Sequence, residues 1–403
     1  MTSSIKKDAI SLRIQAMADR EKMLRGNHEY FYNQPISELR GAAQVLVNGR
    51  EMAMFASYSY LGLVGHPRIN AAAQAAVERY GTGTHGVRFL AGTLDLHQEL
   101  EETIANFKKA ESSVTYSSGY VTNMTVISTL AVRGDIVISD KLNHASIVDG
   151  CLLSGAEFAR FHHNNMEDLE RLLKRSPSNQ AKIVVADAVF SMDGDIVDLP
   201  RMVDLCRKYD AWLMIDEAHS VGVLGKTGHG IEEHFGMEDV IDIKMGTLSK
   251  TIPAAGGYAA GKKDMIDYLR HASRGYIFSA ALTPAQAGAA NEAFKVIIDE
   301  PWRVDKLRKN ASHFISSLQQ AGFDTMRTET AIVPVLCGSD ENAFAMTREA
   351  QSEDIFILPV ISPAVPQGLA RLRATVTAAH ESSEIDHAVA ILKQAGKKVG
   401  LLK

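Results

Sequence analysis

Apolar and polar residues along the chain follow two different periods. Apolar positions three to four residues apart predict helices near 68–80, 96–109, 120–132, 144–153, 165–174 and 200–209. Short apolar and β-branched segments between them predict strands at 113–116, 136–139, 182–187, 212–216, 242–245 and 257–260. These segments lack clean alternation, as is typical of strands buried on both faces. The order predicts an α/β fold with a mostly parallel central sheet wrapped by helices.

The N-terminal 50 residues follow a different pattern. Residues 8–25 carry apolar side chains at helical spacing, which predicts an amphipathic helix lying on the body of the protein or on a partner subunit; its apolar positions are Ile10, Ile14, Met17 and Leu24. An Asn-Gly pair at 48–49, inside an alternating stretch, predicts a hairpin. We therefore expect residues 1–50 to form an N-terminal helix and arm.

The pattern changes again near residue 285. A long helix is predicted from about Pro284 to 299, followed by a helix–strand–helix series with strands at 331–336, 355–358 and 371–377. This series predicts a smaller α+β domain. We therefore expect a large domain at 51–285, which binds the ligand at the carboxyl ends of its strands, and a C-terminal domain at 286–403.

Composition narrows the function classes. Of 403 residues, 46% are hydrophobic and 23% charged, as in an ordinary globular protein. The 43 Lys and Arg against 48 Asp and Glu give a net charge of −5, which argues against a nucleic-acid partner. The three widely spaced cysteines argue against a disulfide framework. No apolar run approaches the roughly 18 residues of a membrane span, and the N-terminus lacks an apolar signal segment, so we expect a cytoplasmic protein without a membrane span.

The segment at 212–219 is the first that indicates chemistry. Four apolar residues lead to Asp216, with His219 three positions later, which predicts a buried strand that delivers both side chains at its carboxyl end. An Asp-x-x-His pair has two possible uses. It could begin a metal site, or the carboxylate could face a cationic ring nitrogen. The segment alone leaves both open.

A lysine further along the chain favours the second use. Lys250 follows Thr247 and Ser249 and precedes a glycine-rich run at 254–257. A partly desolvated lysine suits a Schiff base, and the hydroxyls suit a nearby phosphate. Alone, Lys250 would more often be a solvated surface charge. An upstream Asp at a strand end together with such a lysine is the pairing that a pyridoxal phosphate enzyme needs.

Further segments complete a set of motifs. Ser-Ser-Gly-Tyr at 117–120 predicts a strand end that turns into a helix, which is a ready site for a phosphate. The other motifs are Asn-His-Ala-Ser at 143–146, Ser-Met-Asp-Gly-Asp at 191–195, Asp-Glu-Ala-His-Ser at 216–220 and Gly-Thr-Leu-Ser-Lys at 246–250. In this order they resemble the α-oxoamine synthase family of pyridoxal phosphate enzymes, which includes serine palmitoyltransferase, 8-amino-7-oxononanoate synthase and 2-amino-3-ketobutyrate ligase. The resemblance covers nearly the whole chain and implies the fold type I architecture of aspartate aminotransferase.

The resemblance also implies roles for particular residues. Lys250 would form the Schiff base and move the Cα proton, Asp216 would pair with the pyridine nitrogen, and His144 would stack on the ring. His219 and Ser191 would bind near the phenolic oxygen, and Arg373 would grip the substrate carboxylate. The phosphate side would be held by Ser118, Gly119, Tyr120, Thr247 and Ser249, with Ser279 supplied by the neighbouring subunit of a homodimer with shared active sites.

The implied reaction is a decarboxylating condensation of an α-amino acid with an acyl thioester, on coenzyme A or a carrier protein, to an α-amino ketone. His219 stands where aminotransferases of this fold carry Tyr, which favours acyl transfer over transamination. Two other functions are kept: another pyridoxal phosphate reaction, such as aldol cleavage or transamination, and a non-catalytic partner subunit, which the presence of Lys250 and His144 disfavours. Tyr58 stands where glycine- and alanine-using relatives carry Asn, which favours serine. Ile361 replaces an arginine of some relatives, so alanine and glycine are kept as substrates.

Two segments have simpler interpretations. The stretch at 220–227 nearly matches a phosphate-binding loop of nucleotide triphosphatases, but Ser220 replaces its first glycine and no helix is predicted after it. His162 and His163 are predicted to lie in a solvated loop, because no carboxylate or thiolate is spaced to complete a metal site. We therefore expect no metal.

Overall fold

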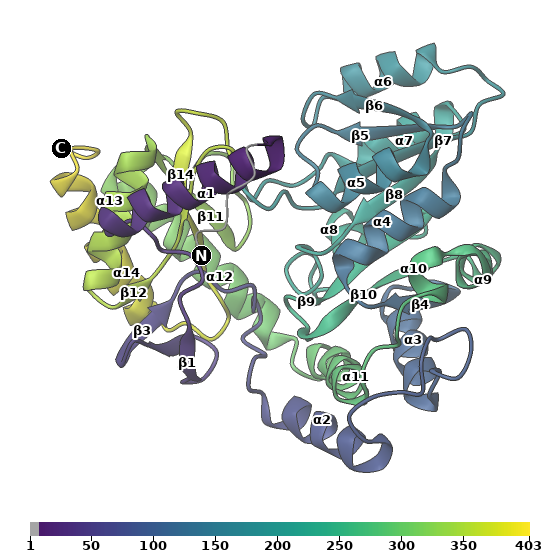
Figure 1. The fold of residues 1–403 in the computed structure, drawn as a ribbon, viewed down its shortest axis with the longest axis horizontal. Coiled ribbons are helices and arrows are strands. Elements are labelled where there is room, and N and C mark those ends of the chain that lie inside the picture. Colours follow the sequence, from purple (N-terminus) through teal and green to yellow (C-terminus); the bar gives the residue numbers. More distant parts are fainter. Residues whose placement is uncertain (1–7) are drawn as a thin grey trace.

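A seven-stranded mixed sheet forms the centre of the large domain. The computed structural model describes residues 8–403 (Figure 1). The sheet order is β4-β10-β9-β8-β7-β5-β6, and only β10 runs antiparallel to its neighbours. The strands are β4 (Ser112–Tyr116), β5 (Ile136–Asp140), β6 (Glu157–Phe161), β7 (Lys182–Asp187), β8 (Trp212–Asp216), β9 (Ile243–Ser249) and β10 (Pro253–Gly261).

Helices cover both faces of this sheet (Figure 1). Residues of β7 alternate between two hydrophobic clusters: Ile183 and Val185 face one, and Val184 and Ala186 face the other. One cluster includes side chains of α4 (Gly119–Leu130), α5 (Ala145–Ser154), α9 (Lys263–Ala272) and α10 (Arg274–Ile277). The other includes α2 (Pro67–Tyr80), α3 (Asp95–Phe107), α6 (Met166–Arg175), α7 (Leu199–Lys208), α8 (Ile231–Phe235) and α11 (Pro284–Asp299). Burial on both faces explains the near-continuous apolar strands.

The C-terminal domain is built on a smaller antiparallel sheet of order β11-β14-β13. Its strands are β11 (Ile332–Gly338), β13 (Pro359–Val360) and β14 (Ala370–Thr375). Helices α12 (Trp302–Ala321), α13 (Asp340–Ser352) and α14 (Ser382–Lys398) pack on it. The two domains lie side by side, and α12 runs from one toward the other (Figure 1).

The N-terminal arm joins the C-terminal domain through a sheet of order β1-β2-β3-β12. Its strands are β1 (Ile36–Leu39), β2 (Gln44–Val47), β3 (Arg50–Met54) and β12 (Ile355–Phe356). Asn48 and Gly49 connect β2 to β3 with positive φ angles of 50° and 76°, the conformation that an Asn-Gly hairpin turn requires. Contacts cross both predicted boundaries, because β3 pairs with β12 and α11 packs on α2 and α3. The boundaries at 51 and 286 remain predictions.

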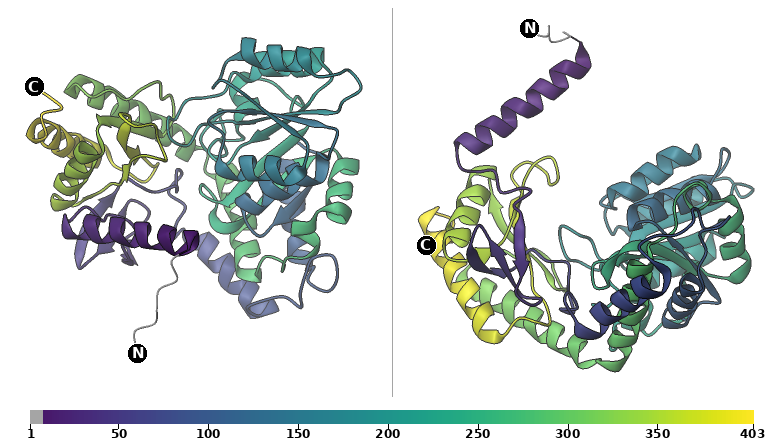
Figure 2. Two further views of the ribbon diagram at one scale, coloured as in Figure 1. Left: turned by 45° about the horizontal axis from the view of Figure 1, so that its top comes forward. Right: turned by 60° about the horizontal axis from the view of Figure 1, so that its bottom comes forward.

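The N-terminal part of helix α1 (Ala9–Gly26) projects from the rest of the chain (Figure 2), whereas Arg20 in its second half donates to the Ser362 carbonyl at 3.3 Å. Of its four predicted apolar contacts only Leu24 is buried, whereas Ile10, Ile14 and Met17 are 61 to 65% exposed. Most of the predicted apolar face therefore does not pack on the body of this chain. The first seven residues of the predicted 1–50 arm lie outside the described residues.

The predicted fold class is confirmed, with local differences. The predicted strands correspond to β4, β5, β7, β8, β9 and β10, and the predicted helices to α2 through α7. Strand β6 was not predicted, because Glu157–Phe161 lies at the sheet edge and only Phe161 is buried. Within residues 8–403, none of the helices combines the length and the apolar character needed to cross a membrane.

Candidate active site

A cavity of about 240 Å³ lies at the carboxyl ends of the parallel strands. Strands β7 and β8 end at Asp187 and Asp216, which are paired in register, so their carboxyl groups meet at one edge of the sheet. Ligands of such sheets bind at this edge. The cavity is lined by Ser118, Gly119, Tyr120, Asn123, His144, Ser146, Asp187, Val189, Asp216, Ala218, His219, Met245, Thr247, Ser249 and Lys250. It brings together most of the predicted site residues.

Asp216 lines the cavity and accepts two hydrogen bonds. It is 5% exposed; its Oδ2 accepts from Asn123 Nδ2 at 2.7 Å and its Oδ1 from the Ala218 N–H at 2.8 Å. These two hydrogen bonds fix the orientation of the carboxyl group, which faces the cavity. The arrangement suits a cationic ring nitrogen. Among residues 8–403, no cluster of His, Cys, Asp and Glu side chains could hold a metal ion.

Lys250 follows β9 and reaches the same cavity. Its Nζ lies 2.9 Å from His219 Nε2, and His219 Nδ1 lies 2.6 Å from the Tyr60 hydroxyl. Burial, opposed by Asp216 and Asp187, lowers the pKa of Lys250 to about 8. Burial and the neighbouring Lys250 also lower the pKa of His219 well below its usual range. His219 is therefore neutral, and Lys250 is neutral often enough to act as a nucleophile near pH 8.

His144 lies beside the cavity as the N-cap of α5. Its backbone N–H donates to Asp187 Oδ2 at 3.1 Å, and its Nδ1 lies 2.7 Å from Ser146 Oγ. Burial lowers the pKa of His144, so the ring is uncharged at neutral pH. A neutral imidazole fixed at its backbone and at one ring nitrogen can present a flat face to a ring-shaped ligand.

The N-terminus of α4 supplies an anion site at one end of the cavity. Ser118 is the N-cap, and its Oγ accepts from the Val121 N–H at 3.1 Å. A Cβ on Gly257 would lie 2.7 Å from backbone atoms of Gly119, so only glycine allows β10 to pass this close to the helix start. Thr247 Oγ1 lies 2.9 Å from Ser249 Oγ at the same end. Free amides, a helix N-terminus and hydroxyls together suit a phosphate.

Arg373 and Tyr58 do not line this cavity, but they lie close to it. Tyr58 lines a neighbouring cavity of about 820 Å³, which also includes Ser249 and Lys250. The Arg373 guanidinium lies 4.8 Å from the centre of the Tyr58 ring, and that ring lies 5.9 Å from the His219 ring. Arg373 Nε donates to the Ser191 carbonyl at 2.6 Å, whereas its buried Nη2 has no partner. An unused guanidinium donor beside the cavity suits a carboxylate. Ser191 itself is not among the residues that line the cavity.

Ser279 lies apart from these residues. It is partly buried, follows Phe278, which is 76% exposed, and does not line the cavity of its own chain. The cavity therefore contains most of the predicted site residues, whereas Tyr58, Ser191, Ser279 and Arg373 lie outside its lining.

Three residues of the site were missed in the sequence. Asp187 ends β7 as Asp216 ends β8, and that repetition was an available signal. Burial, reinforced by Asp216, raises the pKa of Asp187 well above its usual range. Asn123 contacts Asp216 and Tyr60 contacts His219, and no local pattern indicates either contact.

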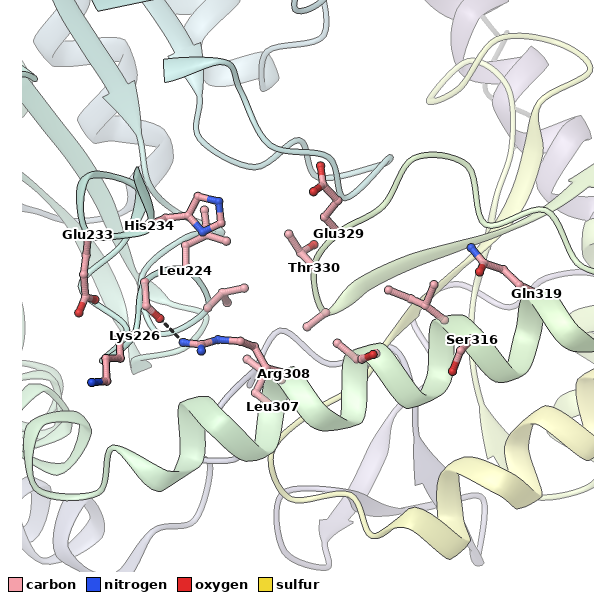
Figure 3. A pocket seen from close by; sticks show the side chains of 16 residues that line it. Leu224, Lys226, Glu233, His234, Leu307, Arg308, Ser316, Gln319, Glu329 and Thr330 are labelled. Atoms are coloured by element: carbon pink, nitrogen blue, oxygen red, sulfur yellow. Dashed lines mark hydrogen bonds between the residues drawn. The ribbon is translucent and has the colours of Figure 1, made fainter. Parts of the chain in front are cut away.

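Another cavity, of about 790 Å³, lies between the domains and contains none of the predicted site residues (Figure 3). Arg308 of α12 crosses this space and donates to the Gly225 carbonyl of the large domain. Of the other charged side chains around it, Lys226 and Glu329 are exposed and Glu233 is partly buried. This cavity is a cleft at the domain junction, and it contains none of the candidate catalytic side chains at the strand ends.

Comparison with known proteins decides the family. The model of the family "Aminotransferase class I and II" matches residues 50–392. The 8-amino-7-oxononanoate synthase 1 of Bacillus subtilis (strain 168) is 42% identical over 379 residues, 94% of this chain and 96% of that protein. The serine palmitoyltransferase of Sphingobacterium spiritivorum is 43% identical over 366 residues, 91% of this chain and 92% of that protein. The chain belongs to the α-oxoamine synthase family.

Solved structures of the family agree in fold. A high-resolution structure of a serine palmitoyltransferase with pyridoxal phosphate has a TM-score of 0.95 at 33% identity, covering 98% of this chain and all of that one. The Sphingomonas wittichii serine palmitoyltransferase has a TM-score of 0.95 at 31% identity, with the same coverage. Membership makes this chain a pyridoxal phosphate-dependent acyltransferase that condenses an amino acid with an acyl thioester.

The cavity fits this cofactor. Asp187 Oδ1 and Asn123 Oδ1 are buried without a hydrogen-bond partner, and each such atom costs ~1–3 kcal/mol unless a polar ligand satisfies it. Asp216, the α4 N-terminus and Lys250 offer contacts to a ring nitrogen, a phosphate and an aldehyde carbon, which are the three polar parts of pyridoxal phosphate.

Proposed function

We propose that the enzyme condenses serine with an acyl thioester, with loss of carbon dioxide, to give an α-amino ketone. The observation that carries this proposal is the convergence of Lys250, Asp216 and His219 in one cavity, with the free donor of Arg373 close to it. When bound, the cofactor supplies an electron sink for the charge that develops at the substrate Cα. The chain supplies orientation, fixed charge and proton transfer.

Each residue contributes a separate step. Arg373 binds the substrate carboxylate with Nη2, next to the Tyr58 ring. Lys250, with its pKa lowered to about 8, takes the Cα proton, and His219 holds Nζ of that lysine at 2.9 Å. The Cα then attacks the thioester carbonyl, the C–S bond breaks, and the sulfur leaves as a thiol with a proton from solvent. The bond from the Cα to the carboxylate breaks next, carbon dioxide departs, and Lys250 returns a proton to the Cα.

Contacts to the cofactor follow from the same geometry. Asp216 would pair with the ring nitrogen, and His144 would stack on the ring. His219 would bind near the phenolic oxygen, together with Ser191, which does not line the cavity. Ser118, Gly119, Tyr120, Thr247 and Ser249 would hold the phosphate.

Serine is the amino acid we propose, because of Tyr58. Its ring lies between Arg373 and His219. An amino acid whose carboxylate is bound by Arg373 would bring its side chain close to this ring. Relatives named for 8-amino-7-oxononanoate synthesis and for serine palmitoyl transfer have nearly the same identity to this chain, so overall similarity does not choose the substrate.

A screen tests the substrate proposal. Serine, alanine and glycine are each incubated with acyl thioesters of graded chain length, on coenzyme A and on a carrier protein, and thiol release is measured. We expect the highest kcat/KM with serine, and Tyr58→Asn should move the preference toward alanine or glycine. A wild-type preference for alanine, unchanged by Tyr58→Asn, contradicts the serine proposal and leaves the condensation intact.

We further propose a homodimer in which Ser279 completes the phosphate site of the neighbouring copy. The support is its position outside the cavity of its own chain, next to the exposed Phe278. Mixed dimers of Lys250→Ala and Ser279→Ala chains contain one site with both native residues. Cofactor affinity should be native in half of the mixed sites, whereas recovery in none of them contradicts the shared site.

A further inference from the structure

The two adjacent histidines at 162 and 163 differ in their surroundings. His162 is a surface residue, with a side chain 74% exposed that pairs with Asp168 at 2.6 Å. His163 is 26% exposed and lies between two carboxylates. Its Nδ1 lies 3.1 Å from Asp140 Oδ1 and its Nε2 2.8 Å from Asp195 Oδ2. The prediction of a solvated loop is therefore wrong for His163, because its side chain turns inward.

Both ring nitrogens of His163 face an acceptor, so the ring must carry two protons. Burial alone would lower the pKa of His163, but the hydrogen bonds to Asp140 and Asp195 outweigh it and raise the pKa to about 10. The Phe190 ring meets the imidazole edge-on, with centroids 4.3 Å apart. Within the described residues, these carboxylates are the charged groups that pair with it. His163 is thus a fixed cation at neutral pH.

His163 links the turn at residues 190–195 to the end of β5 through its contacts with Asp195 and Asp140. Asp140 is the last residue of β5, and Asp195 belongs to the turn. Asn164 extends the link: its backbone N–H donates to Asp140 Oδ2 at 2.8 Å, and its Nδ2 donates to the Ile196 carbonyl at 3.1 Å. His163 and Asn164 therefore both hold the C-terminal end of the turn.

The opposite side of the same turn holds the arginines of β14. The Ser191 carbonyl accepts from Arg373 Nε at 2.6 Å. The Met192 carbonyl accepts from Arg371 Nη1 at 3.2 Å, and Arg371 also pairs with Asp193 at 2.5 Å. The turn therefore lies between His163 and the arginine that faces the substrate.

We propose that His163 is a positioning residue: by bridging Asp140 and Asp195 it fixes the turn at 190–195, and through the Ser191 carbonyl it sets the place of the Arg373 guanidinium. This proposal rests on the proposed function, in which Arg373 binds the substrate carboxylate. Glutamine can replace one hydrogen bond of His163 but carries no charge, so His163→Gln releases the turn without leaving a large void.

Amino-acid binding to the full-length holoenzyme is the readout. It is followed without thioester, by the change in visible absorbance of the bound cofactor. His163→Gln should weaken the Kd for the amino acid about tenfold, within the ~10²-fold that a misplacement of 1 Å can cost. His162→Gln is the matched control, and its Kd should stay within twofold of wild type. An unchanged Kd in His163→Gln, or an equal loss in His162→Gln, overturns the proposal.

A double-mutant cycle separates positioning from general damage. If His163 acts through Arg373, both substitutions affect one contact. The change in binding free energy of the double variant should then be smaller than the sum of the changes of His163→Gln and Arg373→Lys alone. Additive effects overturn the proposal. Because no thioester is present, the experiment reads amino-acid binding even if the condensation itself fails.

Discussion

Two of the cavities of this chain differ in whether their polar groups have partners. The larger of these two, between the domains, is bordered by the exposed side chains of Lys226 and Glu329, and Arg308 already has the Gly225 carbonyl as its partner (Figure 3). The smaller one, at the strand ends, holds buried groups that lack partners, Asp187 Oδ1 and Asn123 Oδ1, and a lysine of lowered pKa. Of these two cavities, the candidate active site is distinguished by buried polar atoms without partners and not by its volume.

Lys250→Ala is the change with the largest expected effect on this comparison. Condensation should fall by at least ~10²–10⁴-fold, the range of a lost proton-transfer group, and the visible absorbance of the lysine-bound cofactor should disappear. Lys226→Ala, in the larger cavity, should leave both unchanged. If the visible band survives in Lys250→Ala, the cofactor is attached elsewhere.

The pH dependence of cofactor attachment comes next. A lysine with a pKa of about 8 becomes neutral as the pH rises through 8, and only the neutral amine attacks an aldehyde. The rate at which cofactor-free protein recombines with pyridoxal phosphate should therefore fall about 100-fold from pH 9 to pH 6 and level off above pH 9. Stopped-flow absorbance measures this rate. A rise that continues beyond pH 10 would show an ordinary, solvated lysine.

Asp216→Asn should lower kcat/KM by about 10- to 100-fold, because a hydrogen bond to a charged group contributes ~1.5–3 kcal/mol. The amide keeps the shape of the side chain but cannot stabilise a cationic ring nitrogen. Glu329→Gln removes the same charge in the larger cavity and should change kcat/KM less than twofold. Equal effects of the two variants would contradict the distinction between the cavities.

Arg373→Lys should have the smallest effect, a rise of about tenfold in KM for the amino acid with a smaller change in kcat, because lysine lacks the planar fork of donors. Arg308→Lys is the matched control at the domain junction. A change in kcat alone would mean that Arg373 does not bind the substrate in its ground state.

The strands and their ends could be predicted from the sequence because local patterns specify them. Apolar runs that end in a polar residue marked β8 with Asp216, and the hydroxyls and glycines around Lys250 marked the end of β9. The sequence motifs also identified the family, which the comparisons confirm.

Side-chain direction and tertiary contacts could not be predicted in this way. His162 and His163 are identical in type, yet only the second turns inward, because Asp140 and Asp195 arrive from distant segments. Asn123 reaches Asp216 across 93 positions of the chain. The apolar positions of α1 predicted burial, but most of them are exposed, because periodicity shows a face and not what covers it.

The most direct test of the central claim is the stoichiometry of the wild-type reaction. Serine labelled at its carboxyl carbon is incubated with an acyl thioester and the holoenzyme, and released thiol and labelled carbon dioxide are measured together. We expect equal amounts of thiol and labelled carbon dioxide, formed at the same rate, and neither product with Lys250→Ala. Consumption of serine without thiol release, as in aldol cleavage or transamination, would contradict this expectation.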